Sequence, residues 1–153
     1  MIVYVFDTDT FSEYLNEETL PEADAPITRR IATLAPEQVL ICAVTLAEVM
    51  RGMLNFLQRM EKAGKDAVGY AALLRADNVI HRFTIAPYTD EAHAHFANFA
   101  PAVRRLGRPD CQIAALALAN NYVVVTRNTR HFSQIPGVIF EDWTRASIEV
   151  ADL

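Results

Sequence analysis

Short, uninterrupted apolar runs alternate along the chain with longer stretches in which apolar residues recur every three or four positions. The runs at 2–6, 39–44 and 122–126 are rich in β-branched and aromatic residues, which is typical of strands buried on both faces. Weaker strands are predicted at 82–86 and 138–140, the second after a loop at 127–136. The helical periodicity predicts helices at 8–16, 25–34, 45–62, 66–78, 89–106 and 110–120.

This alternation of strands and helices indicates an α/β fold. Right-handed crossovers between the strands would give a mainly parallel sheet that is covered on both faces. The 153 residues suit one hydrophobic core, and there is no internal repeat or Gly/Ser-rich linker. We therefore expect a single domain over residues 1–153.

Composition narrows the class of protein further. With 52% hydrophobic and 22% charged residues, the chain is an ordinary globular sequence. Cys42 and Cys111 have no disulfide-like or metal-like spacing, so reduced core thiols are expected. The first apolar run is short and ends in two aspartates, which is typical of neither a signal peptide nor a membrane anchor. The protein is expected in the cytoplasm.

Polar side chains follow several of the predicted strands. Asp7 ends the first strand, Glu48 lies one turn into the helix after the second, Asp110 opens the helix before the strand at 122–126, and Asn128 follows that strand. In open parallel sheets, ligands bind beyond the carboxyl ends of the strands. These four side chains are therefore predicted to converge on one catalytic site.

A cluster of carboxylates predicts a bound cation, since unpaired buried negative charges are costly. Hard oxygen ligands favour Mg²⁺ or Mn²⁺. Such an ion, held by acids and completed by a substrate phosphate, activates water for phosphodiester cleavage. The sequence thus predicts phosphodiester hydrolysis with Asp7, Glu48 and Asp110 as the metal ligands.

Each of these side chains also has a structural interpretation. Thr45 and Glu48 fit a helix capping box, and Asp110 fits an N-cap. The His93/His95 pair is poorly spaced for chelation on a helix, because its rings would point about 200° apart. His131 lies in a loop near the predicted site, where it could touch substrate or be structural.

Arginines are concentrated near the predicted site, although the net charge of −5 argues against a protein that binds nucleic acid with its whole surface. Arg104, Arg105 and Arg108 precede Asp110, and Arg127 and Arg130 flank the asparagine at 128. A basic rim around an acidic pit would bind the phosphate backbone of RNA. Solvated surface charge is the alternative interpretation.

At the level of motifs, the chain resembles the PIN domain family, and in particular the toxin nucleases of VapBC-type toxin–antitoxin pairs. The resemblance covers nearly the whole chain, in five segments that occur in the family's order: VFDTDTFSEYL, ICAVTLAEVMRG, GRPDCQIAALALANN, VVVTRNTRHF and IPGVIFEDW. It implies a three-layer α/β/α sandwich with Mg²⁺- or Mn²⁺-dependent endoribonuclease activity. It also implies a homodimer and a small antitoxin that covers the active site.

The family motif places its three metal-binding acids at Asp7, Glu48 and Asp110. Thr8, Asp9 and Thr126 match flanking polar positions that orient the ligands. Many relatives have an aspartate where this chain has Asn128, and others have asparagine there with an aspartate at the position of His131. Neither position carries a carboxylate here, so one metal ion is expected rather than two.

The helix at 45–62 offers more apolar surface than a single core-facing stripe needs, through Met50, Met53, Phe56, Leu57 and Met60. An antitoxin helix could dock on this surface. The alternative is that all of it belongs to the core and to a dimer interface.

Two other functions compete with the nuclease hypothesis. The Asp7-Thr8-Asp9 segment is similar to the nucleophile motif of haloacid-dehalogenase-like phosphatases, but Phe11 stands where that motif has Thr or Val, and Lys62 and Lys65 are poorly placed to supply its cation. A degenerate PIN fold that serves as an RNA- or protein-binding module is the non-enzymatic alternative. It is favoured by the missing fourth carboxylate.

Overall fold

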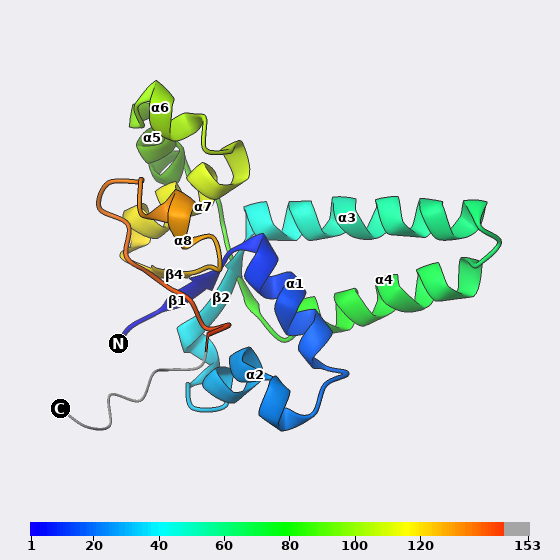
Figure 1. Cartoon of the computed structure of the whole chain (residues 1–153). Coiled ribbons are helices and arrows are strands. Elements are labelled where there is room, and N and C mark those ends of the chain that lie inside the picture. The colour runs from blue at the N-terminus through cyan, green and yellow to red at the C-terminus, as the bar shows by residue number, and fades with distance from the viewer. Residues whose placement is uncertain (146–153) are drawn as a thin grey trace.

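The computed structural model describes residues 1–145, which form a five-stranded parallel sheet with helices around it (Figure 1). The strands are β1 (Tyr4–Phe6), β2 (Val39–Cys42), β3 (Thr84–Ala86), β4 (Val123–Val125) and β5 (Phe140–Glu141). Their order in the sheet is β3-β2-β1-β4-β5, and every neighbouring pair is parallel. The five predicted strands are all present; β1 to β4 are shorter than predicted, and β5 is displaced so that it shares only Phe140 with the predicted range.

The helices occupy most of the chain between the strands. They are α1 (Thr8–Glu17), α2 (Pro26–Ile31), α3 (Ala43–Lys62), α4 (Asp66–Ile80), α5 (Asp90–Asn98), α6 (Pro101–Arg104), α7 (Arg108–Asn120) and α8 (Thr129–Phe132). Two 3₁₀ turns lie at Glu22–Asp24 and Pro36–Gln38. Within residues 1–145, no helix is long and apolar enough to cross a membrane.

Alternating side chains of each strand enter two separate cores. Tyr4 and Phe6 of β1 point to the face covered by α1, α2, α3 and α4, whereas Val5 points to the face covered by α5, α7 and α8. All three side chains are almost fully buried. The continuous apolar runs therefore predicted the right arrangement, because both faces of the sheet are covered. The result is the expected three-layer α/β/α sandwich.

Several predicted helix boundaries differ from the observed ones; the helix expected at 25–34, for example, is the shorter α2, which ends at Ile31. The helix expected at 89–106 is divided into α5 and α6 before Pro101, because a proline disfavours helical backbone at the residue before it. Two helices begin two residues earlier than expected, α3 at Ala43 and α7 at Arg108. The loop expected at 127–136 contains the short helix α8.

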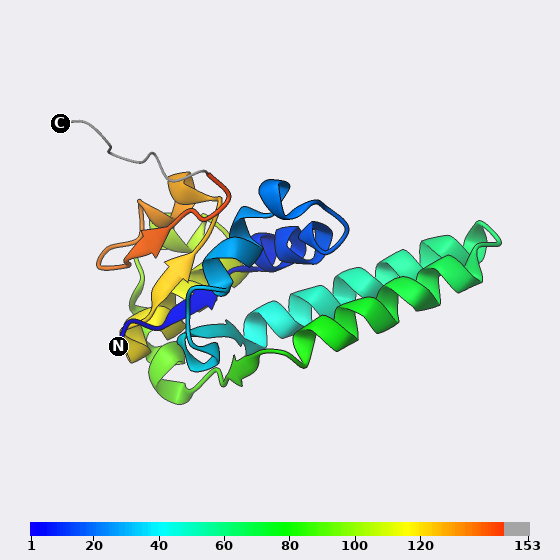
Figure 2. The same ribbon diagram turned by 90° about the horizontal axis from the view of Figure 1, so that it is seen from below.

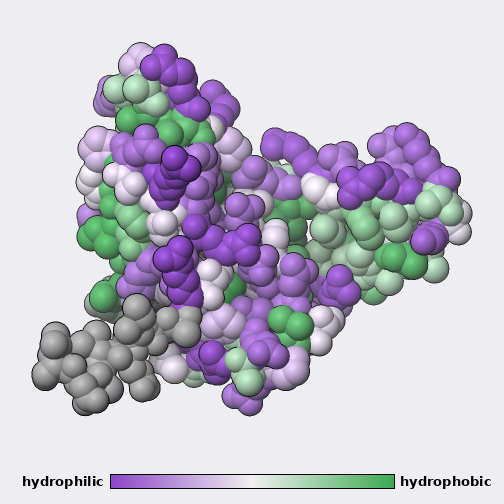
Figure 3. Space-filling model, in the orientation of Figure 1, coloured by the Kyte–Doolittle hydropathy of each residue, from purple (hydrophilic) through white to green (hydrophobic). Residues whose placement is uncertain are grey.

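Helices α3 and α4 form an antiparallel arm that extends away from the sheet (Figures 1 and 2). The two helices approach closely at Gly69, where an added Cβ would lie 2.8 Å from Leu57 Cδ1. In Figure 3, polar residues cover the upper side of the arm and apolar residues gather on its lower side. The base of the arm lies at the carboxyl end of β2, beside the predicted site.

Candidate active site

Asp7 follows β1 and lies in the interior, with 1% of its surface exposed. Its Oδ1 accepts a hydrogen bond of 2.9 Å from the backbone amide of Thr10, and its Oδ2 accepts one of 2.6 Å from the Thr126 hydroxyl. Asp7 is therefore the N-cap of α1, a role that the sequence had not assigned to it. Thr126 thus contacts Asp7 directly, at one of the flanking positions predicted to orient a ligand.

Burial raises the pKa of Asp7 to about 6, from an ordinary value of 3.8. The hydrogen bonds from Thr126 and Thr10 lower this pKa, and the nearby negative charge of Asp110 raises it further. The carboxylate is thus held where its negative charge is poorly solvated. A cation close to Asp7 would relieve that cost.

Glu48 reaches the same site from the second turn of α3. Its Oε1 accepts a short hydrogen bond from the hydroxyl of Thr8, as expected for a threonine that orients a ligand. The capping-box interpretation of Thr45 and Glu48 is wrong, because α3 begins at Ala43 and the Thr45 hydroxyl donates instead to the carbonyl of Phe6, at 3.2 Å. The Glu48 carboxylate therefore does not cap α3 and can take part in the site.

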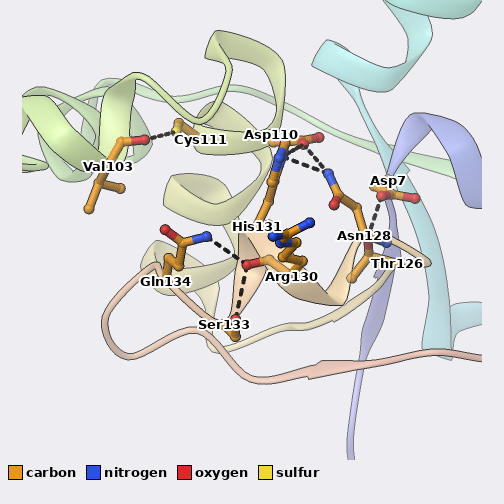
Figure 4. A network of polar contacts seen from close by, with 10 residues as sticks. All are labelled: Asp7, Val103, Asp110, Cys111, Thr126, Asn128, Arg130, His131, Ser133 and Gln134. Atoms are coloured by element: carbon orange, nitrogen blue, oxygen red, sulfur yellow. Dashed lines mark hydrogen bonds and ion pairs between the residues drawn. The ribbon is translucent and has the colours of Figure 1, made fainter.

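Asp110 lies in the first turn of α7, on the face of the sheet opposite to α1. It is not the N-cap, because α7 is preceded by Gly107, whose φ of 134° suits glycine. Its Oδ2 instead accepts a hydrogen bond of 3.1 Å from Asn128 Nδ2 (Figure 4). Burial raises the pKa of Asp110, and the charge of Asp9 raises it as well.

Asn128 and His131 form a polar network with Asp110 (Figure 4). The amide Nδ2 of Asn128 lies 2.7 Å from His131 Nδ1, which itself lies 3.5 Å from Asp110 Oδ2. The backbone amide of Asn128 donates to the Thr126 hydroxyl at 2.8 Å. Asn128 and His131 thus both contact Asp110, a contact that the sequence could not assign to His131.

Glu48 and Asp110 line a pocket of about 240 Å³, together with Thr8, Asp9, Gly107 and Pro109. The buried Asp7 is not part of this lining. Every charged side chain in this lining is acidic. Asp9, expected only to orient ligands, contributes to the wall itself. Such a pocket repels the anionic substrate unless a cation enters it first.

The donors in this pocket fit a hard divalent ion, because they are carboxylate and hydroxyl oxygens. Within residues 1–145, however, no three His, Cys, Asp or Glu side chains lie close enough together to coordinate a metal ion directly. Mg²⁺ commonly keeps several waters and binds through one or two carboxylates. The pocket therefore fits a hydrated ion better than a fully protein-coordinated one.

Comparison with known proteins identifies the family. The PIN domain model matches residues 4–138. The chain belongs to the PIN domain family. Curated relatives include tRNA(fMet)-specific endonuclease VapC of Salmonella typhimurium, which is 30% identical over 114 residues that make up 72% of this chain and 79% of the relative. Ribonuclease VapC1 of Haemophilus influenzae strain R2866 is 26% identical over 78% of this chain and 85% of its own length.

Solved structures support the same assignment. The chain resembles a chain of DNA-bound VapBC from Salmonella typhimurium, with a TM-score of 0.70 and 28% identity over 94% of this chain and 99% of that chain. It also shares its fold with a chain of VapBC-1 from nontypeable Haemophilus influenzae, with a TM-score of 0.70 and 21% identity over 94% of this chain and 100% of that one. The family favours the nuclease interpretation over the phosphatase alternative.

None of the five predicted rim arginines, Arg104, Arg105, Arg108, Arg127 and Arg130, lines the acidic pocket of this PIN domain. Arg127 makes an ion pair of 2.9 Å with Glu13, so part of its charge is already neutralised. The guanidinium of Arg108 lies 5.0 Å from the centre of the Phe96 ring. Arg130 is exposed, and its carbonyl accepts hydrogen bonds from Ser133 and Gln134 (Figure 4). Among residues 1–145, Arg108 and Arg130 take part in no ion pair, so their charges are available to a phosphate.

Proposed function

We propose that the protein is a cytoplasmic, metal-dependent endoribonuclease, consisting of a single PIN domain, and that it is the toxin of a toxin–antitoxin pair. Its relatives include proteins named ribonuclease VapC1 and tRNA(fMet)-specific endonuclease VapC, and its structural neighbours include VapBC complexes. One feature of the chain itself carries the proposal. All the charged side chains that line the pocket are acidic, and the pocket adjoins the buried Asp7, whose pKa is about 6.

In this proposal, Asp7, Glu48 and Asp110 would hold a hydrated Mg²⁺ or Mn²⁺ at the pocket, in part through the waters of the ion. A bound divalent ion lowers the pKa of its water and offsets the charge of the reacting phosphate. Thr8 fixes the orientation of Glu48, and Thr126 fixes that of Asp7. These hydroxyls hold the carboxylates in place before the substrate arrives.

Asn128 supports Asp110 from the other side. Because its Nδ2 donates to Asp110 Oδ2, the asparagine stabilises the ionised carboxylate without adding negative charge. We propose it as a positioning residue of the catalytic site, and one ion as the occupant. RNA approaches over Arg108, Arg127 and Arg130, whose charges bind the backbone phosphates.

The test is cleavage of several purified RNAs with Mg²⁺, with Mn²⁺ and with EDTA, beside a direct measurement of Mn²⁺ binding by calorimetry. We expect metal-dependent cleavage that Asp7→Asn and Asp110→Asn abolish, with a smaller loss for Glu48→Gln. The exposed Glu61→Gln is the control and keeps full activity. A protein that binds RNA but cleaves none of it with either metal would instead be the degenerate binding module.

For the antitoxin, we propose the groove between α1 and the arm as the docking site. It has a volume of about 200 Å³ and is lined by Ser12, Leu15, Asn16, Met53, Phe56, Ala72, Arg75 and Ala76. Of the five residues predicted on α3, Met53 and Phe56 line this groove and Met50 is exposed, whereas Leu57 is buried between the helices. An amphipathic helix that places apolar side chains in this groove fits its lining.

Co-expression with the small protein encoded beside the gene tests this partner. We expect the complex to co-purify, and Phe56→Asp to weaken it while leaving RNA cleavage by the toxin alone intact. Light scattering on the purified toxin tests the proposed homodimer in the same preparations. A complex that survives Phe56→Asp unchanged would place the antitoxin elsewhere.

A further inference from the structure

A second pocket adjoins the acidic one at the carboxyl ends of β2 and β3. It has a volume of about 340 Å³ and is lined by Ala43, Val44, Ala47, Glu48, Arg51, Tyr88, Arg108, Pro109 and Gln112. Glu48 and Pro109 also line the acidic pocket, so the two spaces share a wall. This volume is within the range of about 300–1,000 Å³ that is usual for small-ligand sites.

The charge of this second pocket is opposite to that of the first. Arg51 and Arg108 face it, with Glu48 as its one acidic group, at the shared wall. Among residues 1–145, neither arginine takes part in an ion pair, in contrast to Arg127. Both guanidinium groups are therefore available to an anion, and Arg108 lies two residues before the proposed ligand Asp110.

Aromatic rings support the pocket on the side of α5. The Tyr88 ring is 6.0 Å from that of His93, and its hydroxyl is 3.3 Å from His93 Nδ1. His93 stacks on Phe96 at 5.8 Å, and Phe96 lies under the guanidinium of Arg108. Tyr88 and Arg108 are thus held by the same row of rings, which reduces the entropy that each loses when a ligand binds.

A polar side chain with both donors and an acceptor completes the lining. Gln112 comes from the second turn of α7 and is half-buried beside Tyr88. An amide group can pair with the edge of a nucleobase, because it offers N–H donors and a carbonyl acceptor together. The pocket therefore combines cations for a phosphate, a ring for stacking and an amide for a base edge.

We propose that this second pocket binds the nucleotide of a single-stranded RNA that lies next to the scissile phosphate. Tyr88 stacks on its base, Arg51 and Arg108 hold its phosphate, and Gln112 selects the base by its edge. Proteins recognise unpaired RNA bases through aromatic stacking and hydrogen bonds to their edges. This inference rests on the proposed ribonuclease function and assigns to it the residues that determine its sequence preference.

Cleavage of an unstructured RNA with a randomised sequence tests the inference, with all cut sites mapped by sequencing. We expect Gln112→Ala to change the base preference at one position beside the cut. Tyr88→Leu raises KM about five- to hundred-fold, as expected for one lost stacking contact, with a smaller change in kcat. Tyr88→Phe keeps the ring and restores most of the affinity.

The matched controls are Tyr70→Leu and Gln58→Ala, both on exposed faces of the arm. They leave KM and base preference unchanged. If the wild type cleaves RNA and the variants at 88 and 112 cleave it with unchanged KM and preference, the second pocket is not a nucleotide site. If the wild type cleaves no RNA with either metal, the failure belongs to the ribonuclease function itself. Thermal melting of each variant identifies any loss of folding.

Discussion

The burial of Asp7 makes a prediction about stability that can be tested without any substrate. In the metal-free protein, Asp7→Asn replaces a carboxyl group that is buried and poorly solvated by an amide of nearly the same shape. The carboxyl has a pKa of about 6 in the folded protein, against 3.8 ordinarily. That difference corresponds to about 3 kcal/mol of folding free energy.

Whether stability rises or falls with pH depends on which state, folded or unfolded, holds the proton of Asp7. Between about pH 4 and pH 6 the unfolded chain has lost this proton while the folded protein retains it, so the stability of the wild type falls as the pH rises. The asparagine variant does not share that loss. It does lose a hydrogen-bond acceptor for the Thr126 hydroxyl, which costs about 1 kcal/mol at every pH.

Relative to the wild type, Asp7→Asn is therefore expected to be about 1 kcal/mol less stable at pH 4 and about 2 kcal/mol more stable at pH 7.5. The difference in stability between variant and wild type therefore changes by about 3 kcal/mol between pH 4 and pH 7.5. For a domain of this size, that change corresponds to about 6–12 °C in Tm. Saturating Mn²⁺ reduces this advantage of the variant at pH 7.5. It stabilises the wild type by about 2.7 kcal/mol at a hundred times its Kd and the variant by less.

Chemical and thermal unfolding from pH 4 to pH 7.5, with EDTA and with Mn²⁺, provide the measurement. The control is Asp24→Asn, the same substitution at an exposed position. A constant difference for Asp7→Asn across this range would refute the reasoning, because it would mean that the folded and unfolded states bind the proton of Asp7 equally.

Three further predictions concern the rim, the support network and the arm. Arg130→Ala lowers RNA affinity and reduces the slope of the logarithm of the RNA-binding constant against the logarithm of the salt concentration by about 1. It leaves Mn²⁺ affinity unchanged. Arg127→Ala has a smaller effect on RNA affinity, because its charge is already paired with Glu13. His131→Asp, measured by calorimetry, increases Mn²⁺ affinity by restoring a carboxylate beside the site, whereas His131→Ala lowers activity about ten- to hundred-fold. Gly69→Ala destabilises the protein by about 1–3 kcal/mol in urea unfolding, because the added Cβ meets the facing helix. Gly52→Ala stabilises it by about 0.5–1 kcal/mol, because a Cβ at position 52 would have nothing within 4 Å.

The sequence predicted the layers of the fold well because burial on both faces leaves a plain pattern. Val123–Val125 could be assigned as a strand from its apolar run alone, and each of its residues is buried. The same holds for the position of Asp7, since a carboxylate directly after a buried parallel strand lies at the edge where such sheets bind ligands. Element type and strand-end position are local properties, and local sequence encodes them.

The detailed contacts of the site depend on tertiary structure and could not be predicted in this way. Thr45 and Glu48 fit a capping box in sequence, yet the Thr45 hydroxyl bonds to the carbonyl of Phe6, 39 residues earlier. The partnership of His131 with Asp110 spans 21 residues. Neither contact leaves a periodic signal, because each depends on how α3, α7 and α8 are placed over the sheet.

The placement of the two pockets explains how a chain with a net charge of −5 can serve as a ribonuclease. The three proposed ligands come from different parts of the fold: Asp7 from the end of the central strand, Glu48 from the base of the arm, and Asp110 from the helix that covers the other face. Their mutual repulsion concentrates negative potential in one small space, where a cation can neutralise it. Arg51 and Arg108 lie across the wall formed by Glu48, so a phosphate can be held beside the acidic pocket without entering it before the cation does. The overall charge of the protein therefore matters less to RNA binding than this local separation of charge.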